Sequence, residues 1–253
     1  MKRARLLALF VLVPLLCNAQ EITVAAAADL QYVFQDVTAR FEKETGAHVK
    51  VIFGSSGNLF TQIQNGAPFD LFFSADIEYP QKLEAAGTAE SGTLYEYAEG
   101  KLVLWTAKAT HLDVNRGLQV LLDPAVKKIA IANPQHAPYG RAAVAALRNE
   151  GIYDKVADKL VLGENISQTA SFVASGSADV GLIALSLALA PSLKESGIYT
   201  EVPVDEYPAI RQGAVVLTAS KDRRLAQQFL AFVKTPAVVK LLKDYGFALP
   251  NAH

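Results

Sequence analysis

The stretch F-G-S-S-G-N-L at residues 53–59 joins two segments of different hydrophobic pattern. It follows a strand-like run at residues 49–52 and leads into a helix-like run at residues 59–63. A helix N-terminus carries unpaired backbone N–H groups and a partial positive charge, and small residues let a ligand approach them. This combination suits an anion at a strand-to-helix turn. Taken alone, however, the stretch favours the alternative that Ser55 or Ser56 only caps the helix, so the rest of the chain must decide.

Composition limits the class of protein. The chain has 253 residues, of which 51% are hydrophobic, and its formal net charge is −1. This charge provides no basic surface for nucleic acid. With one cysteine, four histidines and no C-x-x-C or H-E-x-x-H spacing, the sequence argues against a protein-bound metal cluster. We expect one large domain or two smaller ones, with no cofactor and no nucleic-acid partner.

Residues 1–19 have the pattern of an export signal. The basic start at residues 2–5 precedes an apolar run at residues 6–17 that is too short to span a bilayer. Small residues follow, so we expect cleavage after Ala19 and a periplasmic protein. Lipidation of Cys17 is the alternative. No later stretch is long and apolar enough for a membrane helix.

Short apolar runs alternate with amphipathic ones along the rest of the chain. This alternation predicts mainly parallel α/β sheets with right-handed crossovers, and the number of strands favours two sheets. The predicted strands lie at residues 22–27, 49–53, 70–74, 101–106, 129–132, 161–162, 180–184 and 214–219.

Four of the strand-to-helix turns carry small or polar residues. In parallel sheets, ligands bind beyond the carboxyl ends of the strands, where helices begin. Two of these turns come from the first half of the chain and two from its middle, which favours a cleft between two lobes. The turns are A-A-A-D at 26–29, G-S-S-G at 54–57, P-Y-G at 138–140 and E-N-I-S at 164–167.

Several stretches with specific order and spacing resemble one family. They are I-T-V-A-A-A at 22–27, F-G-S-S-G-N-L at 53–59, G-A-P-F-D-L-F-F-S-A-D at 66–76, N-P-Q-H-A-P-Y-G at 133–140 and K-D-Y-G-F at 243–247. Nearly all of the chain after the export signal resembles the periplasmic molybdate-binding proteins of ABC-type importers. The resemblance implies a ligand, molybdate or tungstate, held by neutral donors and delivered to a membrane permease.

The resemblance also implies an architecture. It is the type II periplasmic binding protein fold, an α/β fold with two lobes, two crossing segments and the ligand cleft between the lobes. Lobe one is expected at residues 21–101 and 211–253, and lobe two at residues 102–210. The crossings are expected near residues 100–101 and 211–212, and the protein is expected to be a monomer.

The family's anion contacts carry over to individual residues. Ser56 matches the binding serine of the second turn, and Ile166 matches a valine whose backbone N–H binds. Tyr139 matches the binding tyrosine of a subgroup, and Ala184 stands where other members have a binding tyrosine. We therefore expect the Tyr139 hydroxyl to bind the anion, and its loss to leave the stability of the free protein nearly unchanged.

The first turn departs from the family pattern. Where members usually offer Ser, Thr or Asn, this chain has Ala28 and Asp29. Only their backbone N–H groups are expected to face the anion, because a carboxylate would repel a dianion. We expect Asp29 to cap its own helix through the N–H of Gln31 or Tyr32. The alternative is that Asp29 accepts the proton of hydrogen phosphate, as in a sulfate- or phosphate-type binding protein.

Other polar residues near the turns have simpler interpretations. Ser55 is expected to be a turn residue, His136 structural and Arg141 solvent-facing, while Asp70 and Asp76 are expected to be capping and turn residues.

A serine hydrolase is the remaining alternative. It would combine Ser56, His136 and an aspartate, but the sequence has no G-x-S-x-G elbow and nothing that fixes the histidine near the serine. The sequence therefore favours a binding protein over an enzyme.

Overall fold

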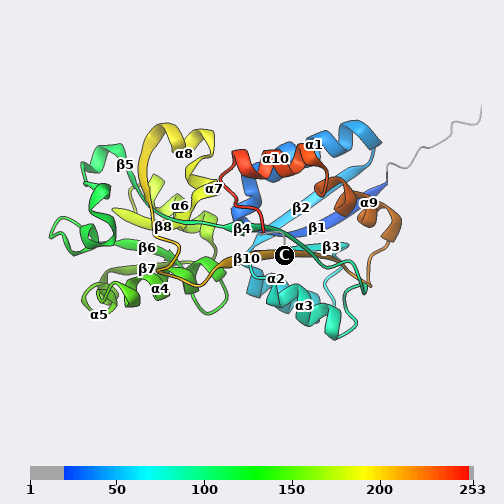
Figure 1. Cartoon of the computed structure of the whole chain (residues 1–253), viewed down its shortest axis with the longest axis horizontal. Coiled ribbons are helices and arrows are strands. Elements are labelled where there is room, and N and C mark those ends of the chain that lie inside the picture. Colours follow the sequence, from blue (N-terminus) through cyan, green and yellow to red (C-terminus); the bar gives the residue numbers. More distant parts are fainter. Residues whose placement is uncertain (1–19, 251–253) are drawn as a thin grey trace, which may run out of the picture.

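The computed structural model describes residues 20–250, so the predicted signal sequence and Cys17 lie outside the described residues. Two lobes lie side by side, each built on a five-stranded sheet (Figure 1). The first sheet has the order β2-β1-β3-β10-β4, and the second has the order β7-β6-β8-β5-β9.

The first sheet consists of β1 (Glu21–Ala27), β2 (His48–Gly54), β3 (Leu71–Ser74), β4 (Tyr95–Gly100) and β10 (Ile210–Val216). The second consists of β5 (Leu102–Ala107), β6 (Ile129–Ala132), β7 (Leu160–Gly163), β8 (Val180–Ala184) and β9 (Gly197–Glu201).

The chain passes between the sheets twice. It does so between β4 and β5 and again between β9 and β10, and Figure 1 shows β4 and β10 reaching the region where the lobes meet. In each sheet one strand, β10 or β5, runs against the other four. The reversed strand is the first one after a crossing. The prediction of mainly parallel sheets is therefore confirmed, while the predicted second crossing at residues 211–212 falls inside β10.

Helices cover both faces of each sheet (Figure 1). On the first lobe, α1, α9 and α10 lie on one face and α2 and α3 on the other. Their bounds are α1 Gln31–Thr45, α2 Ser56–Gln64, α3 Glu78–Ala85, α9 Arg223–Val233 and α10 Pro236–Asp244. The second lobe has α4 Pro138–Asn149, α5 Tyr153–Val156, α6 Ile166–Ala174, α7 Leu185–Ala188 and α8 Pro191–Ser196. Short 3-10 helices are η1 Ala28–Leu30, η2 Lys108–Thr110, η3 Val114–Leu122 and η4 Ala157–Lys159.

Helix α1 illustrates how the sequence pattern builds the first lobe. Its apolar residues recur at helical spacing, and Phe34 and Phe41 are buried against α9. The ring of Phe34 meets Phe73 edge-on at 5.0 Å, and Phe41 meets Phe229 at 5.1 Å. The helix ends at Gly46, whose φ of +71° suits glycine. Because η1 leads directly into α1, this packing also holds η1 in place at the carboxyl end of β1.

Two strands were not predicted. β4 has the sequence Y-E-Y-A-E-G, and its two glutamates interrupt the apolar run that would indicate a buried strand. β9 is a partly exposed edge strand and has no continuous apolar run either. Among residues 20–250, no single helix is long and apolar enough to cross a membrane. Only α9 and α10 together reach that length, as a pair bent by 62°, and their apolar residues lie in the core of the first lobe.

Strand ends of both sheets meet between the lobes. β1 and β2 lead into η1 and α2, while β6 and β7 lead into α4 and α6. Ala27, Ala28 and Ala75 of the first lobe belong to the same apolar cluster as the core of the second lobe. The four turns predicted from the sequence therefore belong to strands that end at the lobe interface.

Candidate oxyanion site between the lobes

A small cavity of about 10 Å³ lies between the lobes, at the starts of four helices. All five residues predicted to bind the anion line it: Ala28, Asp29, Ser56, Tyr139 and Ile166. This volume is about what one water molecule needs, so the lobes close tightly around the site. The turns that are far apart in the sequence thus line one small cavity.

Ser56 is the first residue of α2 and is buried. Its Oγ accepts a hydrogen bond of 2.9 Å from the backbone N–H of Ala75. Because the oxygen acts as the acceptor, the hydroxyl proton is available to a ligand. Neither Ser55 nor Ser56 caps α2 with its side chain, so the capping alternative is wrong.

Ile166 begins α6 at the second lobe's edge of the cavity. Asn165 caps this helix by accepting from the N–H groups of Ser167 and Gln168, each at 3.0 Å. The cap leaves the N–H of Ile166 at the cavity, where a helix start favours an anion.

Asp29 does not cap its own helix, and that prediction is wrong. Its Oδ2 accepts hydrogen bonds from the Tyr139 hydroxyl at 2.9 Å and from Gln212 Nε2 at 2.6 Å. The side chain is 1% exposed, and its Oδ1 has no hydrogen-bond partner among residues 20–250. The carboxylate bonds instead to buried donors on α4 and β10.

Burial raises the pKa of the Asp29 carboxyl from 3.8 to about 6. Hydrogen bonds from Gln212 and Tyr139 to Oδ2 oppose this rise. The nearby backbone N–H groups of Asp29 and Leu30 oppose it to a lesser degree, without making a hydrogen bond to Oδ1. Burial also raises the pKa of the Tyr139 hydroxyl well above 10, and the neighbouring Asp29 charge adds to the shift. Tyr139 is therefore a neutral donor at any physiological pH.

Two residues of this network were missed by the sequence reasoning. Gln212 is fully buried on β10, and its Oε1 accepts from the Tyr97 hydroxyl at 2.7 Å. Tyr97 lies on the unpredicted strand β4 and also donates to the carbonyl of Ser74 at 3.2 Å. Gln212 stands beside the exposed Arg211 and before the predicted strand at residues 214–219, so no local pattern marked it as buried.

Hydrogen bonds between the lobes hold the cavity closed. The Oγ of Ser55 lies 2.8 Å from Nδ1 of His136, and the N–H of Gly57 donates to the His136 carbonyl at 2.9 Å. On the opposite side, the Ser186 hydroxyl donates to the carbonyl of Asp29 at 2.8 Å. Ser55 and His136 thus have a structural role in joining the lobes.

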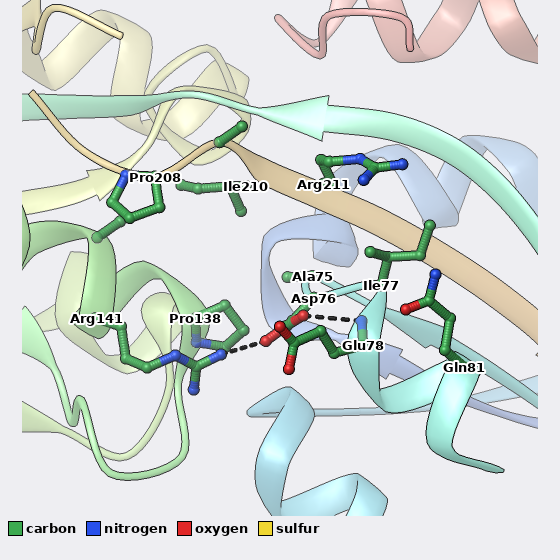
Figure 2. Close-up of a pocket in the computed structure, with 12 residues that line it drawn as sticks. Ala75, Asp76, Ile77, Glu78, Gln81, Pro138, Arg141, Pro208, Ile210 and Arg211 are labelled. Atoms are coloured by element: carbon green, nitrogen blue, oxygen red, sulfur yellow. Dashed lines mark hydrogen bonds and ion pairs between the residues drawn. The ribbon is translucent and has the colours of Figure 1, made fainter. Parts of the chain in front are cut away.

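A larger groove of about 450 Å³ lies next to the cavity and is shown in Figure 2. Arg141 of α4 points across it and pairs with Asp76, which follows β3 in the other lobe. Arg141 therefore stays partly exposed, as expected, but it pairs with Asp76 across the groove rather than pointing freely into solvent. Asp76 also accepts from the N–H of Glu78 at 2.9 Å, and Asp70 accepts from the N–H groups of Thr23 and Lys221, as expected of capping and turn residues.

Two α/β lobes joined by two crossing segments, with a cavity at their strand ends, define a type II periplasmic binding protein. The chain belongs to the bacterial extracellular solute-binding protein family, whose profile matches residues 22–248.

Relatives within this family are close. The molybdate-binding protein ModA of Azotobacter vinelandii is 43% identical over 237 residues, which cover 93% of each chain. ModA of Rhodobacter capsulatus is 38% identical over 96% of this chain and 94% of its own. The solved structure of the Azotobacter vinelandii periplasmic molybdate-binding protein matches with a TM-score of 0.86, over 91% of this chain and all of that one. These relatives are transport proteins, and the resemblance stated from the sequence is confirmed.

Proposed function

We propose that this protein captures molybdate or tungstate between its lobes and delivers it to the permease of an ABC importer. The observation that carries the proposal is that four helix starts and two neutral hydroxyls, on Ser56 and Tyr139, line one small cavity. The relatives that bear the name of molybdate-binding proteins support the choice of anion.

The donors suit a tetrahedral dianion. Ser56 offers a hydroxyl proton, and Ala28, Asp29 and Ile166 offer backbone N–H groups at helix starts. Donors held in place before binding make charge-assisted hydrogen bonds without a formal counter-ion. A site of this kind distinguishes dianions by radius, because every oxygen must reach its donor.

The remaining parts of the proposal follow from the same function. The signal sequence is cleaved after Ala19, and the protein works in the periplasm as a monomer. The oxyanion is a transported ligand and no cofactor is used. Lobe one comprises residues 21–101 and the chain from β10 onward, and lobe two runs from residue 102 to the end of β9, so the second boundary lies before the expected residue 211. The protein catalyses no reaction of its own.

Hydrogen phosphate is a second candidate ligand, and Asp29 is the observation that favours it. A carboxylate beside the cavity can accept the proton that phosphate carries at neutral pH. The names of the relatives favour molybdate, so phosphate is the rival that the experiment must test.

Isothermal calorimetry of the purified mature protein tests the proposal. Molybdate and tungstate should bind comparably, and sulfate should bind ten- to a hundredfold more weakly, because a lost hydrogen bond to a charged group costs roughly 1.5–3 kcal/mol. Chromate and phosphate complete the series, and a chromogenic ester tests for hydrolase activity. Sulfate binding within about threefold of molybdate, or turnover of the ester, would refute the proposal.

A further inference from the structure

The Asp29 carboxylate is the one ionisable group in the cavity wall that the proposed function leaves unexplained. Its Oδ2 is occupied by Tyr139 and Gln212, while its Oδ1 is buried without a hydrogen-bond partner among the described residues. Asp29 lines the cavity beside Ser56 and Ile166. An unpaired buried oxygen beside a ligand cavity is costly unless the ligand completes its hydrogen bonding.

No cation of residues 20–250 faces this carboxylate. Gln212, which donates to it, is neutral, and the neighbouring Arg211 instead pairs with Glu96. Tyr139 on α4 and Tyr97 on β4 are the titratable groups nearest to it, and both are neutral because their pKa values are raised. Burial, the largest cause, raises the pKa of Asp29 to about 6.

The other elements packed against η1 bring no compensating charge either. Helices α6 and α7 contain no charged residue, and the charged residues of β2 lie at its far end. In the first turn of α1, Tyr32 is the one titratable residue. The first charged residue of this helix is Asp36, which lies on the surface and accepts a hydrogen bond from the Tyr245 hydroxyl. His136 is the remaining titratable group near the cavity, through its bond to Ser55.

A dianion entering this space meets a conflict of charge. An ionised carboxylate at contact distance would repel it strongly in a buried site. At pH 7.5 a carboxyl with a pKa of about 6 is ionised about thirty times more often than it is neutral. Binding to the neutral form alone therefore lowers the affinity only about thirtyfold. The neutral form also turns Oδ1 from an acceptor into a donor.

We propose that Asp29 determines the specificity of the site by binding the oxyanion as a neutral carboxylic acid. A proton from solvent forms an O–H bond on Oδ1, and this O–H donates to an oxygen of a fully deprotonated tetrahedral dianion. No bond of the anion breaks. Binding therefore takes up one proton, and affinity falls as pH rises. The inference rests on the proposed function and adds the protonation state of the site.

Hydrogen phosphate would behave differently at the same residue. It carries its own proton, which it would donate to an ionised Asp29, so its binding would take up none. The two ligands thus differ in the number of protons exchanged as well as in affinity. This difference separates the neutral-acid site from a phosphate site.

Isothermal calorimetry at pH 7.5 measures the protons exchanged on binding when it is repeated in two buffers of different ionisation enthalpy. Neither buffer should be a tetrahedral oxyanion. Molybdate binding to the wild-type protein should take up between half a proton and one. Between pH 6 and pH 8 the affinity should fall ten- to fiftyfold, as linkage to one group of this pKa requires. In Asp29→Asn, whose amide supplies a permanent donor, uptake should vanish and the affinity should not change with pH.

Two variants serve as controls. Asp70→Asn makes the same change at a buried aspartate that precedes β3, away from the cavity, and should keep the wild-type uptake. His136→Asn tests the other titratable group and should also keep it. The inference would be overturned if the wild-type protein bound molybdate without proton uptake. It would also be overturned if the uptake were lost in His136→Asn and kept in Asp29→Asn. Tight phosphate binding without proton uptake, with no heat from molybdate, would overturn it too. If none of the anions gives heat at any pH, the proposed function itself fails.

Discussion

Asp29 and Tyr139 lie 110 residues apart in the chain, yet the Tyr139 hydroxyl donates to the Asp29 carboxylate at 2.9 Å in a fully buried contact. The bond joins the two lobes at the wall of the candidate site. It also links site chemistry to folding, because the loss of either partner would remove one buried hydrogen bond and leave Gln212 as the remaining partner of the other.

The first prediction concerns Tyr139→Phe. The sequence suggested that the free protein would hardly be affected, but the hydroxyl hydrogen-bonds to both Asp29 and Gln212. Its loss should lower the free energy of unfolding of the free protein by about 1–3 kcal/mol. It should also weaken molybdate ten- to a hundredfold, because the hydroxyl gives its one proton to Asp29 and so holds that side chain at the cavity wall. Thermal denaturation and calorimetry measure the two effects. If neither changes, Tyr139 is only a packing residue.

The second prediction is a pH dependence of the unliganded protein. The pKa of the Asp29 carboxyl is 3.8 in the unfolded chain, its ordinary value, and about 6 in the folded protein. The folded protein therefore binds a proton at Asp29 more readily than the unfolded chain does. Its contribution to stability therefore decreases as pH rises from about 4 to about 6 and stays low above that. The decrease amounts to roughly 3 kcal/mol.

Asp29→Asn removes this titration. Relative to the wild type, the variant should gain stability at pH 7.5, and the gain should shrink as pH falls toward 4. Chemical denaturation at a series of pH values measures the difference. A constant difference across this range would show that Asp29 keeps an ordinary pKa in the fold.

The third prediction concerns the closed form. A Cβ added at Gly57 would lie 2.6 Å from the carbonyl oxygen of His136, which is backbone and belongs to the other lobe. Gly57→Ala should therefore separate the lobes, raise the radius of gyration in small-angle scattering and weaken the anion at least tenfold. Asn58→Ala, one residue further along α2, is the matched control and should do neither. Unchanged scattering and affinity in Gly57→Ala would show that the lobes adjust at no cost.

Much of this arrangement could be predicted from the sequence, since strand-to-helix turns are local. The turns at Ser56, Tyr139 and Ile166 begin helices and line one cavity, as small residues after apolar runs indicated. The side-chain partners could not be predicted in this way. Asp29 was expected to bond within its own turn, but Gln212, which is 183 residues away, reaches it across the first sheet. Long-range pairing depends on the register of β10, which no local pattern encodes.

The last prediction concerns Arg141, a cation of the neighbouring groove that could be mistaken for a counter-ion. Its guanidinium pairs with Asp76 across the groove and lies 5.8 Å from the ring centroid of Tyr79. The pair is partly exposed, so solvent screens it and it should be worth less than about 1 kcal/mol. Arg141→Gln should weaken molybdate by less than about fivefold, and added salt should reduce the difference further. Arg148→Gln, near the far end of the same helix, should have no effect on binding. A loss of a hundredfold or more in Arg141→Gln would instead mean that the arginine turns from Asp76 to the anion, and that the site holds its ligand with a full positive charge.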